Sequence, residues 1–312
     1  MIELEGDELA EVVEEILDDP EHNFECIQVA ITGPDQCAIL FEMGDSDNDS
    51  TVSVVFLVDG FDAKSARIVL LLNRWLGSLS ATSLADLSAL EVGRDIWRGP
   101  VGGVWSRTQA ANHYAERVWC FDPSTAYLVG EHGLVSRFNG VTYDRIEPGR
   151  DELLFDIHGL KRDAIFCVGV GGTLQWLKGD RWEPIDLGMS HRLRGVDATQ
   201  APHLLRFGGD DGQAFELRGL GELVPLEAPE PEAYVFTVRE FRGEVYWGDS
   251  DFGVLKQRGT VLEPFHQTGL AYDLRCDDRF LYAVGTDMAW RFDGSSWRSL
   301  RLRYGEGRFW LE

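Results

Sequence analysis

Short apolar runs separated by glycine turns recur through the last two thirds of the chain. A turn glycine follows an apolar run at intervals of 39, 39, 40 and 37 residues, at Gly130, Gly169, Gly208, Gly248 and Gly285. A second set keeps step with the first, at Gly140, Gly179, Gly219, Gly259 and Gly294. A period of about 40 residues made of strand-like runs is typical of a β-propeller blade.

Each unit contains about four strands. A further β-prone run lies about twelve residues before the first glycine, as in Leu154 to Ile157, Leu193 to Val196, Tyr234 to Val238 and Tyr272 to Leu274. Tight hairpin turns need positive φ, which glycine adopts without steric cost. We therefore predict a mostly β chain with a five-bladed propeller, or six-bladed if Gly93 to Thr108 supplies part of a blade. A β-sandwich is the alternative, but sandwiches do not repeat at a fixed period.

The units carry a resemblance to a known kind of repeat. The segments AVGTDMAWRFDGSSW (Ala283 to Trp297) and CVGVGGTLQWLKGDRW (Cys167 to Trp182) resemble bacterial β-propeller repeats of the type "apolar-VG, G, apolar, RF-DG-W". The resemblance spans about Ala115 to Leu302 and implies a fold rather than an activity, since propellers host many functions. The match to kelch repeats is imperfect, and the signatures of WD40 repeats are missing.

The first part of the chain shows a different pattern. Asp7 can cap a helix, and apolar residues at helical spacing predict a helix from about Glu8 to Asp19, stopped by Pro20. Three strand-like runs follow, at Phe24 to Thr32, Cys37 to Met43 and Thr51 to Val58.

A second helix is predicted from Ala63 to Leu76, with Asp62 as its cap and Gly77 at its end. This αβββα order lacks the 40-residue repeat, so residues 1–92 are predicted to form a small acidic α+β domain. Residues 93–110 then form a linker or edge strands, and residues 111–312 form the propeller. An edge strand would help to close the ring.

Charge narrows the classes of partner. The formal net charge is -24, and residues 1 to 25 contain eleven acids and no Lys or Arg. Such a chain repels nucleic acid and anionic lipid and attracts a basic surface, so we predict a basic protein partner, no nucleic acid and no membrane. The alternative is that the acidic surface serves solubility alone.

Composition also suggests a compartment. The start of the chain shows no targeting pattern, and no apolar run is long enough to span a bilayer. Five cysteines form no CxxC pair, and several lie in strand-like runs. We therefore expect a reduced, cytoplasmic protein.

Motifs of catalysis and of metal binding are weak. Asp45 to Ser50 resembles the start of a calcium loop, but Ser50 stands where glycine is needed and Phe56 where glutamate is needed, so a hairpin turn is expected. The seven histidines show no zinc spacing, and the sequence has no GxSxG or Walker motif. GVGG at Gly169 to Gly172 is placed in a hairpin rather than before a phosphate-binding helix. We predict no catalytic residue, no metal and no cofactor.

One set of residues points to binding. The turns at the first glycines read GEHG, GVGG, GGDDG, GDSDFG and GTDM, and equivalent turns lie on one face of a propeller. Acids occur in four of the five turns, at Glu131, Asp210, Asp211, Asp249, Asp251 and Asp287. We interpret them as candidate partner-binding residues, because gathered carboxylates favour a Lys- or Arg-rich surface. The alternative is that Asp simply suits these turns.

Three functional hypotheses follow. The leading one is a non-enzymatic binding module that captures a basic protein, with the immunity protein of an antibacterial toxin as a concrete version. The second is an intracellular scaffold or sensor. The third is a hydrolase or lyase acting at the mouth of the propeller channel.

Overall fold

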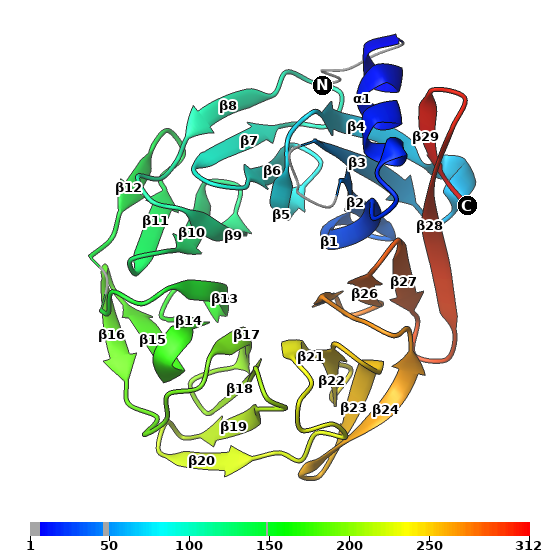
Figure 1. Cartoon of the computed structure of the whole chain (residues 1–312). Coiled ribbons are helices and arrows are strands. Elements are labelled where there is room, and N and C mark those ends of the chain that lie inside the picture. The colour runs from blue at the N-terminus through cyan, green and yellow to red at the C-terminus, as the bar shows by residue number, and fades with distance from the viewer. Residues whose placement is uncertain (1–6, 46–49, 148) are drawn as a thin grey trace.

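Seven β-sheets arranged in a ring make up the protein (Figure 1). This computed structural model describes residues 7–45, 50–147 and 149–312. The propeller and the mostly β composition are confirmed, but the predicted count of five or six blades is wrong, because the sheets number seven. Every blade is built from consecutive strands that pair antiparallel.

Blades one to three have four strands each. Blade one consists of β1 (Asn23–Gly33), β2 (Gln36–Gly44), β3 (Thr51–Asp59) and β4 (Arg67–Leu72). Blade two consists of β5 (Leu76–Ser83), β6 (Asp86–Glu91), β7 (Asp95–Gly99) and β8 (Ser106–Gln109). Blade three consists of β9 (Ala115–Asp122), β10 (Thr125–Gly130), β11 (Leu134–Phe138) and β12 (Tyr143–Arg145).

The four remaining blades contain the repeats that are clearest in the sequence. Blade four consists of β13 (Leu154–Lys161), β14 (Ala164–Gly169), β15 (Thr173–Lys178) and β16 (Arg181–Ile185). Blade five consists of β17 (Leu193–Gln200), β18 (Leu204–Gly209), β19 (Ala214–Arg218) and β20 (Glu222–Pro225). Blade six consists of β21 (Val235–Phe241), β22 (Glu244–Asp249), β23 (Gly253–Arg258) and β24 (Val261–Gln267). Blade seven has five strands, β25 (Asp273–Cys276), β26 (Leu281–Gly285), β27 (Met288–Phe292), β28 (Trp297–Gly305) and β29 (Arg308–Leu311).

The first 92 residues do not form a separate α+β domain. The helix α1 (Asp7–Asp18) is confirmed, and the three predicted strands lie within β1, β2 and β3. These strands, however, form blade one, and the segment predicted as a linker, residues 93–110, contains β7 and β8 of blade two. The half blade suggested by Gly93 is thus the outer part of a whole blade.

The predicted second helix, Ala63 to Leu76, is wrong for a physical reason. Asp62 does cap a turn, since its side chain accepts from the backbone N–H of Lys64 at 3.0 Å, but the turn is a 3₁₀ segment of three residues, η1 (Ala63–Ser65). The following apolar run is strand β4, whose side chains alternate between two cores, with Leu71 in one and Leu70 and Leu72 in the other. Burial on both faces of a sheet overrides helix propensity here. A second 3₁₀ segment, η2 (Val170–Gly172), lies in the GVGG turn.

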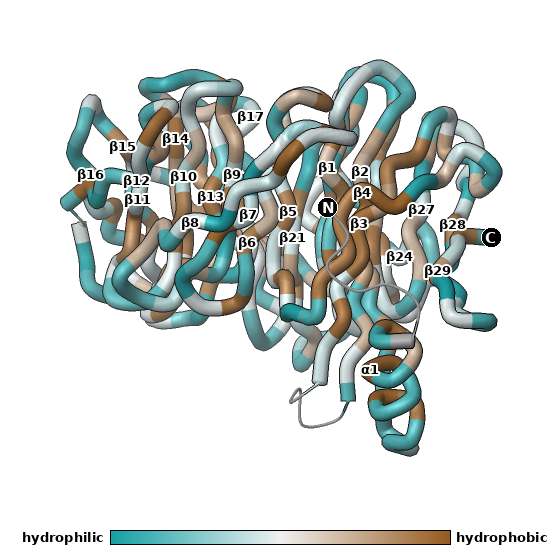
Figure 2. The backbone as a smooth tube through the Cα atoms, turned by 90° about the horizontal axis from the view of Figure 1, so that it is seen from above, coloured by the Kyte–Doolittle hydropathy of each residue, from teal (hydrophilic) through white to brown (hydrophobic). Residues whose placement is uncertain are grey.

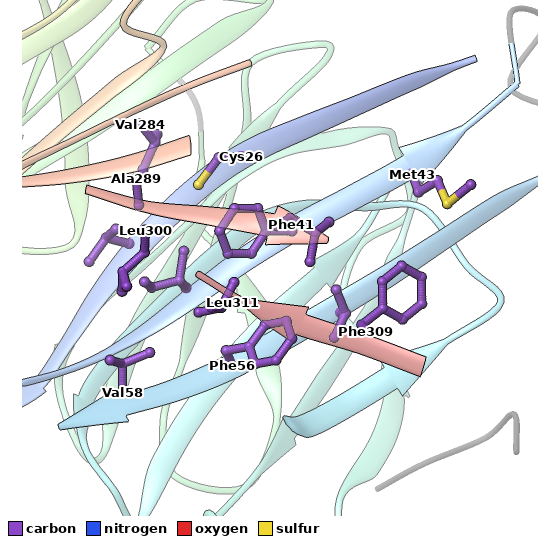
Figure 3. Close-up of a cluster of buried hydrophobic side chains, with 14 of the residues drawn as sticks. Cys26, Phe41, Met43, Phe56, Val58, Val284, Ala289, Leu300, Phe309 and Leu311 are labelled. Carbon is purple, nitrogen blue, oxygen red and sulfur yellow. The ribbon is translucent and has the colours of Figure 1, made fainter. Parts of the chain in front are cut away.

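Hydrophobic packing closes the ring. Leu300 of β28 and Phe309 and Leu311 of β29 belong to the same buried cluster as Phe41 and Phe56 of blade one (Figure 3). The apolar face of α1 joins this cluster through Leu9, Val13 and Ile16. Each fully buried side chain of this size stabilises the fold by about 1.5–3 kcal/mol. The last blade is therefore held to the first without exchange of a strand between the two ends of the described chain.

The helix marks one face of the ring. Seen edge-on, α1 projects from one side of the propeller (Figure 2). Because α1 leads into the start of β1, it lies on the face where the inner strands begin. No helix among the described residues is long and apolar enough to cross a membrane.

Candidate functional site: the two mouths of the channel

The innermost strands β1, β5, β9, β13, β17, β21 and β25 surround the centre of the ring (Figure 1). Polar side chains link them from blade to blade. Ser78 Oγ accepts from the N–H of Val118 at 3.2 Å, and Asp156 Oδ2 accepts from the N–H of Val196 at 3.0 Å. Such bonds satisfy backbone donors that no ladder partner reaches.

A chain of ion pairs lies deep in the channel. Arg117 Nε lies 3.3 Å from Asp156 and its Nη2 lies 3.5 Å from Asp273. Asp156 lies 4.0 Å from Arg239, and Asp273 lies 3.0 Å from Arg275. The order is Arg239, Asp156, Arg117, Asp273, Arg275, so a positive charge stands at each end.

Opposite charges in this chain of ion pairs stabilise the ionised form of Asp156. Burial alone would raise the pKa of Asp156, but the neighbouring arginines, Arg117 first, hold it below its ordinary value. Because the guanidinium groups of Arg117 and Arg239 lie beside it, Asp156 remains ionised in a buried place. The chain separates two cavities, one at each mouth of the channel.

The first cavity, of about 250 Å³, opens where the inner strands begin, and we call it the acidic mouth. Its walls carry Glu25, Glu116, Phe155, Phe236 and Tyr272, with Arg117, Arg194 and Asp273 also present. An adjoining cavity of about 220 Å³ shares Glu25 and Glu116 and extends to Trp75 and Tyr114.

Two carboxylates of the acidic mouth, those of Glu25 and Glu116, form no ion pair with a Lys or Arg among the described residues. Among the ion pairs of the described residues none involves Glu25 or Glu116, because Arg117 is engaged by Asp156 and Asp273 and Arg194 by Asp210. Burial raises the pKa of Glu25, although Tyr272 donates a hydrogen bond to it. Burial also raises the pKa of Glu116. The charge of Glu131 raises it further, whereas Arg117 and Arg194 lower it without cancelling the shift. Glu25 and Glu116 are therefore available to bind a cation that enters this mouth.

A third carboxyl group lies directly behind Glu25. Glu42 of β2 faces Glu25 across the ladder and is only 4% exposed. Burial and the charge of Glu25 raise the pKa of Glu42 to about 8. Like charges directly opposite in a sheet are destabilising, so Glu42 is mostly protonated at neutral pH.

The second cavity, of about 310 Å³, opens where the inner strands end, and we call it the arginine mouth. Arg239 and Arg275 lie at its base, and Trp119, Leu160 and Ile31 contribute apolar walls. Glu240 and Asp277 also line it. The acidic mouth thus carries two glutamates that form no ion pair, whereas the arginine mouth carries the two end arginines of the buried chain of ion pairs together with two acids.

The six predicted turn acids lie at the same end of the channel as the acidic mouth. Each lies at the end of the second strand of its blade or directly after it, and successive antiparallel strands end on alternating faces of the ring. We call this the acidic face, and the exposed acids of α1 also lie on it: Glu8, Glu11, Glu14, Glu15 and Asp18.

The turn acids differ in what they contact. Glu131, Asp211 and Asp251 are exposed. Asp210 is bound by Arg194, and Asp287 lies 3.2 Å from Arg301.

Asp249 differs from the others because it is fully buried. Its Oδ1 accepts from the N–H groups of Asp251 and Phe252, both at 2.8 Å, which shapes the turn. Asp249 therefore has a structural place, whereas the three exposed acids are free to meet a partner.

Sequence reasoning did not identify Glu25, Glu116 or the arginines of the channel. Glu42 gave a signal, because it interrupts the apolar run Cys37 to Met43. The proposed calcium-like segment lies between β2 and β3, and its residues 46–49 lie outside the described residues. No cluster of three or more potential metal ligands occurs among the residues that the structure describes.

Comparison with known proteins defines the fold only. The sequence matches no protein-family model and no curated protein. A solved structure titled "YCF48 bound to D1 peptide" is similar with a TM-score of 0.64 and 12% identity, covering 86% of this chain and 91% of that one. Sqt1 from Chaetomium thermophilum, bound to the N-terminus of ribosomal protein L10, has a TM-score of 0.65 and 13% identity, covering 91% and 90%. The WD40 propeller of Doa1 has a TM-score of 0.62 and 11% identity, covering 85% and 94%.

Proposed function

We propose that this protein is a non-enzymatic binding module that captures a Lys- or Arg-bearing segment of another protein at the acidic mouth. The observation that carries the proposal is the pair Glu25 and Glu116, two carboxylates on the wall of one cavity without a cationic partner. Aromatic rings stand beside them, and cations are attracted both to carboxylates and to ring faces.

The surface around the mouth supports the same partner. Glu131, Asp211 and Asp251 are exposed on the acidic face together with the acids of α1. Exposed charges of one sign steer an oppositely charged partner and raise its association rate. The mouth would then hold one basic side chain while the surrounding acids guide the approach.

Two of the similar propellers have been solved with a peptide or a protein terminus. At 12% and 13% identity they support only that a propeller of this size can hold such a segment. An immunity protein that covers a basic toxin would be one case of such capture.

Fluorescence anisotropy with a labelled hexa-arginine peptide tests the proposal on the full chain. We expect E25Q/E116Q to bind about tenfold or more weakly than wild type, since each tenfold corresponds to about 1.4 kcal/mol of binding free energy. Burial disfavours the charge of both side chains, so the amides should not weaken the fold. The matched control is D163N, which removes one exposed acid at the β13–β14 turn on the opposite face. Equal affinity of E25Q/E116Q and wild type would refute the proposal.

Proton release gives an independent test. A bound cation lowers the raised pKa values of Glu25 and Glu116, so binding should release protons at a pH where these groups are partly protonated. Calorimetry in two buffers of different ionisation enthalpy measures this release. A binding heat that does not depend on the buffer would place the peptide away from these carboxylates.

A further inference from the structure

The arginine mouth shows a second kind of site, at the other end of the channel from the acidic mouth. Its base contains the two ends of the buried chain of ion pairs. Arg239 lies 4.0 Å from Asp156 and Arg275 lies 3.0 Å from Asp273, and neither has another carboxylate within ion-pair distance among the described residues. The central Arg117, by contrast, has two.

The two end arginines face the same cavity from neighbouring blades. Arg239 belongs to β21 and Arg275 to β25, and both line the arginine mouth. Arg239 is buried, and its Nη2 has no hydrogen-bond partner, whereas its Nη1 donates to the carbonyl oxygens of Val196 and Val238. Burial and the charges of Arg239 and Arg117 lower the pKa of Arg275 to about 10 against the opposing effect of Asp273, although the guanidinium stays charged at neutral pH. An anion between the two would close the chain into an alternating ring.

We propose that the arginine mouth binds a small organic monocarboxylate between Arg239 and Arg275. A planar guanidinium matches a carboxylate through paired N–H donors. Trp119, Leu160 and Ile31 offer an apolar surface for the body of the ligand. The cavity of about 310 Å³ is well above the roughly 30 Å³ that one water occupies in the liquid.

Other groups around the cavity define the charge of the ligand. Glu240 is held by Arg206 at 3.0 Å, and Asp277 accepts the N–H groups of Arg279 and Phe280 at 2.7 Å. His158 Nδ1 accepts from the N–H of Ala198 at 2.9 Å, and burial lowers the pKa of His158 against the opposing effect of Asp197, 3.3 Å away, so the ring is neutral at pH 7. With two acids and no Lys or Arg besides Arg239 and Arg275 among the residues that line the cavity, a single negative charge is favoured over a dianion such as phosphate.

Calorimetric titration of the full chain with benzoate tests the proposal in a low-salt buffer without chloride. We expect saturable binding of one benzoate per chain, and no binding of benzamide, which has the same shape without the charge. R275Q should weaken benzoate binding about tenfold or more, because it removes one of the two guanidinium partners. K161Q removes an exposed cation at the end of β13 and should leave the affinity unchanged.

A second pair of variants avoids the buried network, in case R275Q disturbs the fold. Leu160 lines the cavity and is 58% exposed, so a polar side chain there should not affect folding. L160E places a negative charge at the opening and should weaken benzoate binding severalfold, whereas L160Q, of equal size, should not. Absence of benzoate binding to wild type, equal loss in L160E and L160Q, or binding of inorganic phosphate in preference to benzoate would overturn the proposal.

Discussion

The two mouths of the channel differ in how their charges are compensated. At the acidic mouth, Glu25 and Glu116 lack a cation, while the nearby arginines are engaged elsewhere. At the arginine mouth, Arg239 and Arg275 have one carboxylate each. The same buried chain produces both conditions, because Arg117 attracts Asp156 and Asp273 to the middle of the channel. Because Arg117 is paired with these two aspartates, it forms no ion pair with Glu116 at one mouth, and Arg239 and Arg275 share their aspartates with it at the other.

The largest effect on stability is expected when Arg117, the middle residue of the buried chain of ion pairs, is replaced. R117M leaves Asp156 and Asp273 with one cation each in a buried place, so the free energy of unfolding should fall by about 3–5 kcal/mol at pH 7. Urea unfolding measures this loss. The control is R162M, which breaks an exposed pair with Asp122 and should cost no more than about 1 kcal/mol.

The pH dependence of R117M has a defined sign. The pKa of Asp156 is lowered in the folded state, so its ionisation stabilises the fold above the unfolded pKa, and this contribution is lost as the pH falls. The difference between wild type and R117M should therefore shrink below about pH 4. A difference that stays constant from pH 7 to pH 3 would show that the chain of ion pairs does not stabilise the fold through Asp156.

The next effect concerns the carboxyl group behind the acidic mouth. The folded pKa of Glu42, about 8, lies above the ordinary value, so the fold loses stability as the pH rises from about 4.5 through 8. E42Q removes this loss and should raise the free energy of unfolding by about 2–4 kcal/mol at pH 9, with little change at pH 4. Urea unfolding at both pH values tests the prediction. A uniform gain at both would mean that charge is not the cause.

Turn acids should separate into structural and exposed classes. D249A leaves the N–H groups of Asp251 and Phe252 without their acceptor and should cost about 1–2 kcal/mol of stability, measured by thermal or urea unfolding. D249N keeps an acceptor oxygen and should recover most of this cost. Equal stability of all three proteins would show that the side chain does not hold the turn.

The smallest effect on stability is expected from E131Q/D211N/D251N. These side chains are exposed, so the free energy of unfolding should change by less than about 0.5 kcal/mol. Association of the hexa-arginine peptide should nevertheless slow severalfold at low salt and converge with wild type at high salt, which stopped-flow anisotropy measures. Unchanged association at low salt would leave steering to the acids of α1.

The sequence allowed the repeat to be recognised only where turn chemistry marks it. Blades three to seven carry glycine at equivalent turns, such as Gly130 and Gly285, because those turns approach other backbone atoms too closely for a Cβ. Blade one does end its second strand, β2, with Gly44, but blade two ends β6 with Glu91, so the glycine spacing of about 40 residues is interrupted there. The cap at Asp62 was predicted correctly, but the run after it is buried on both faces in β4, and local signals do not contain that information.

The residues at the two mouths of the channel were still harder to predict from the sequence. The turn acids could be found because Asp and Gly recur together at one position of the repeat. Glu25 and Glu116 are 91 residues apart in the chain and become neighbours only when seven blades close a ring. Likewise, Arg117 and Asp273 meet across the channel from blades three and seven. Without the correct number of blades, no pattern along the chain could have paired them.

A crystal structure of the full chain with the hexa-arginine peptide tests the central claim most directly. We expect one guanidinium group of the peptide in the acidic mouth, within hydrogen-bond distance of the carboxylates of Glu25 and Glu116, and the remaining arginines over Glu131, Asp211 or α1. A peptide seated only on α1, or at the arginine mouth beside Glu240 and Asp277, would contradict the assignment of the acidic mouth as the binding site.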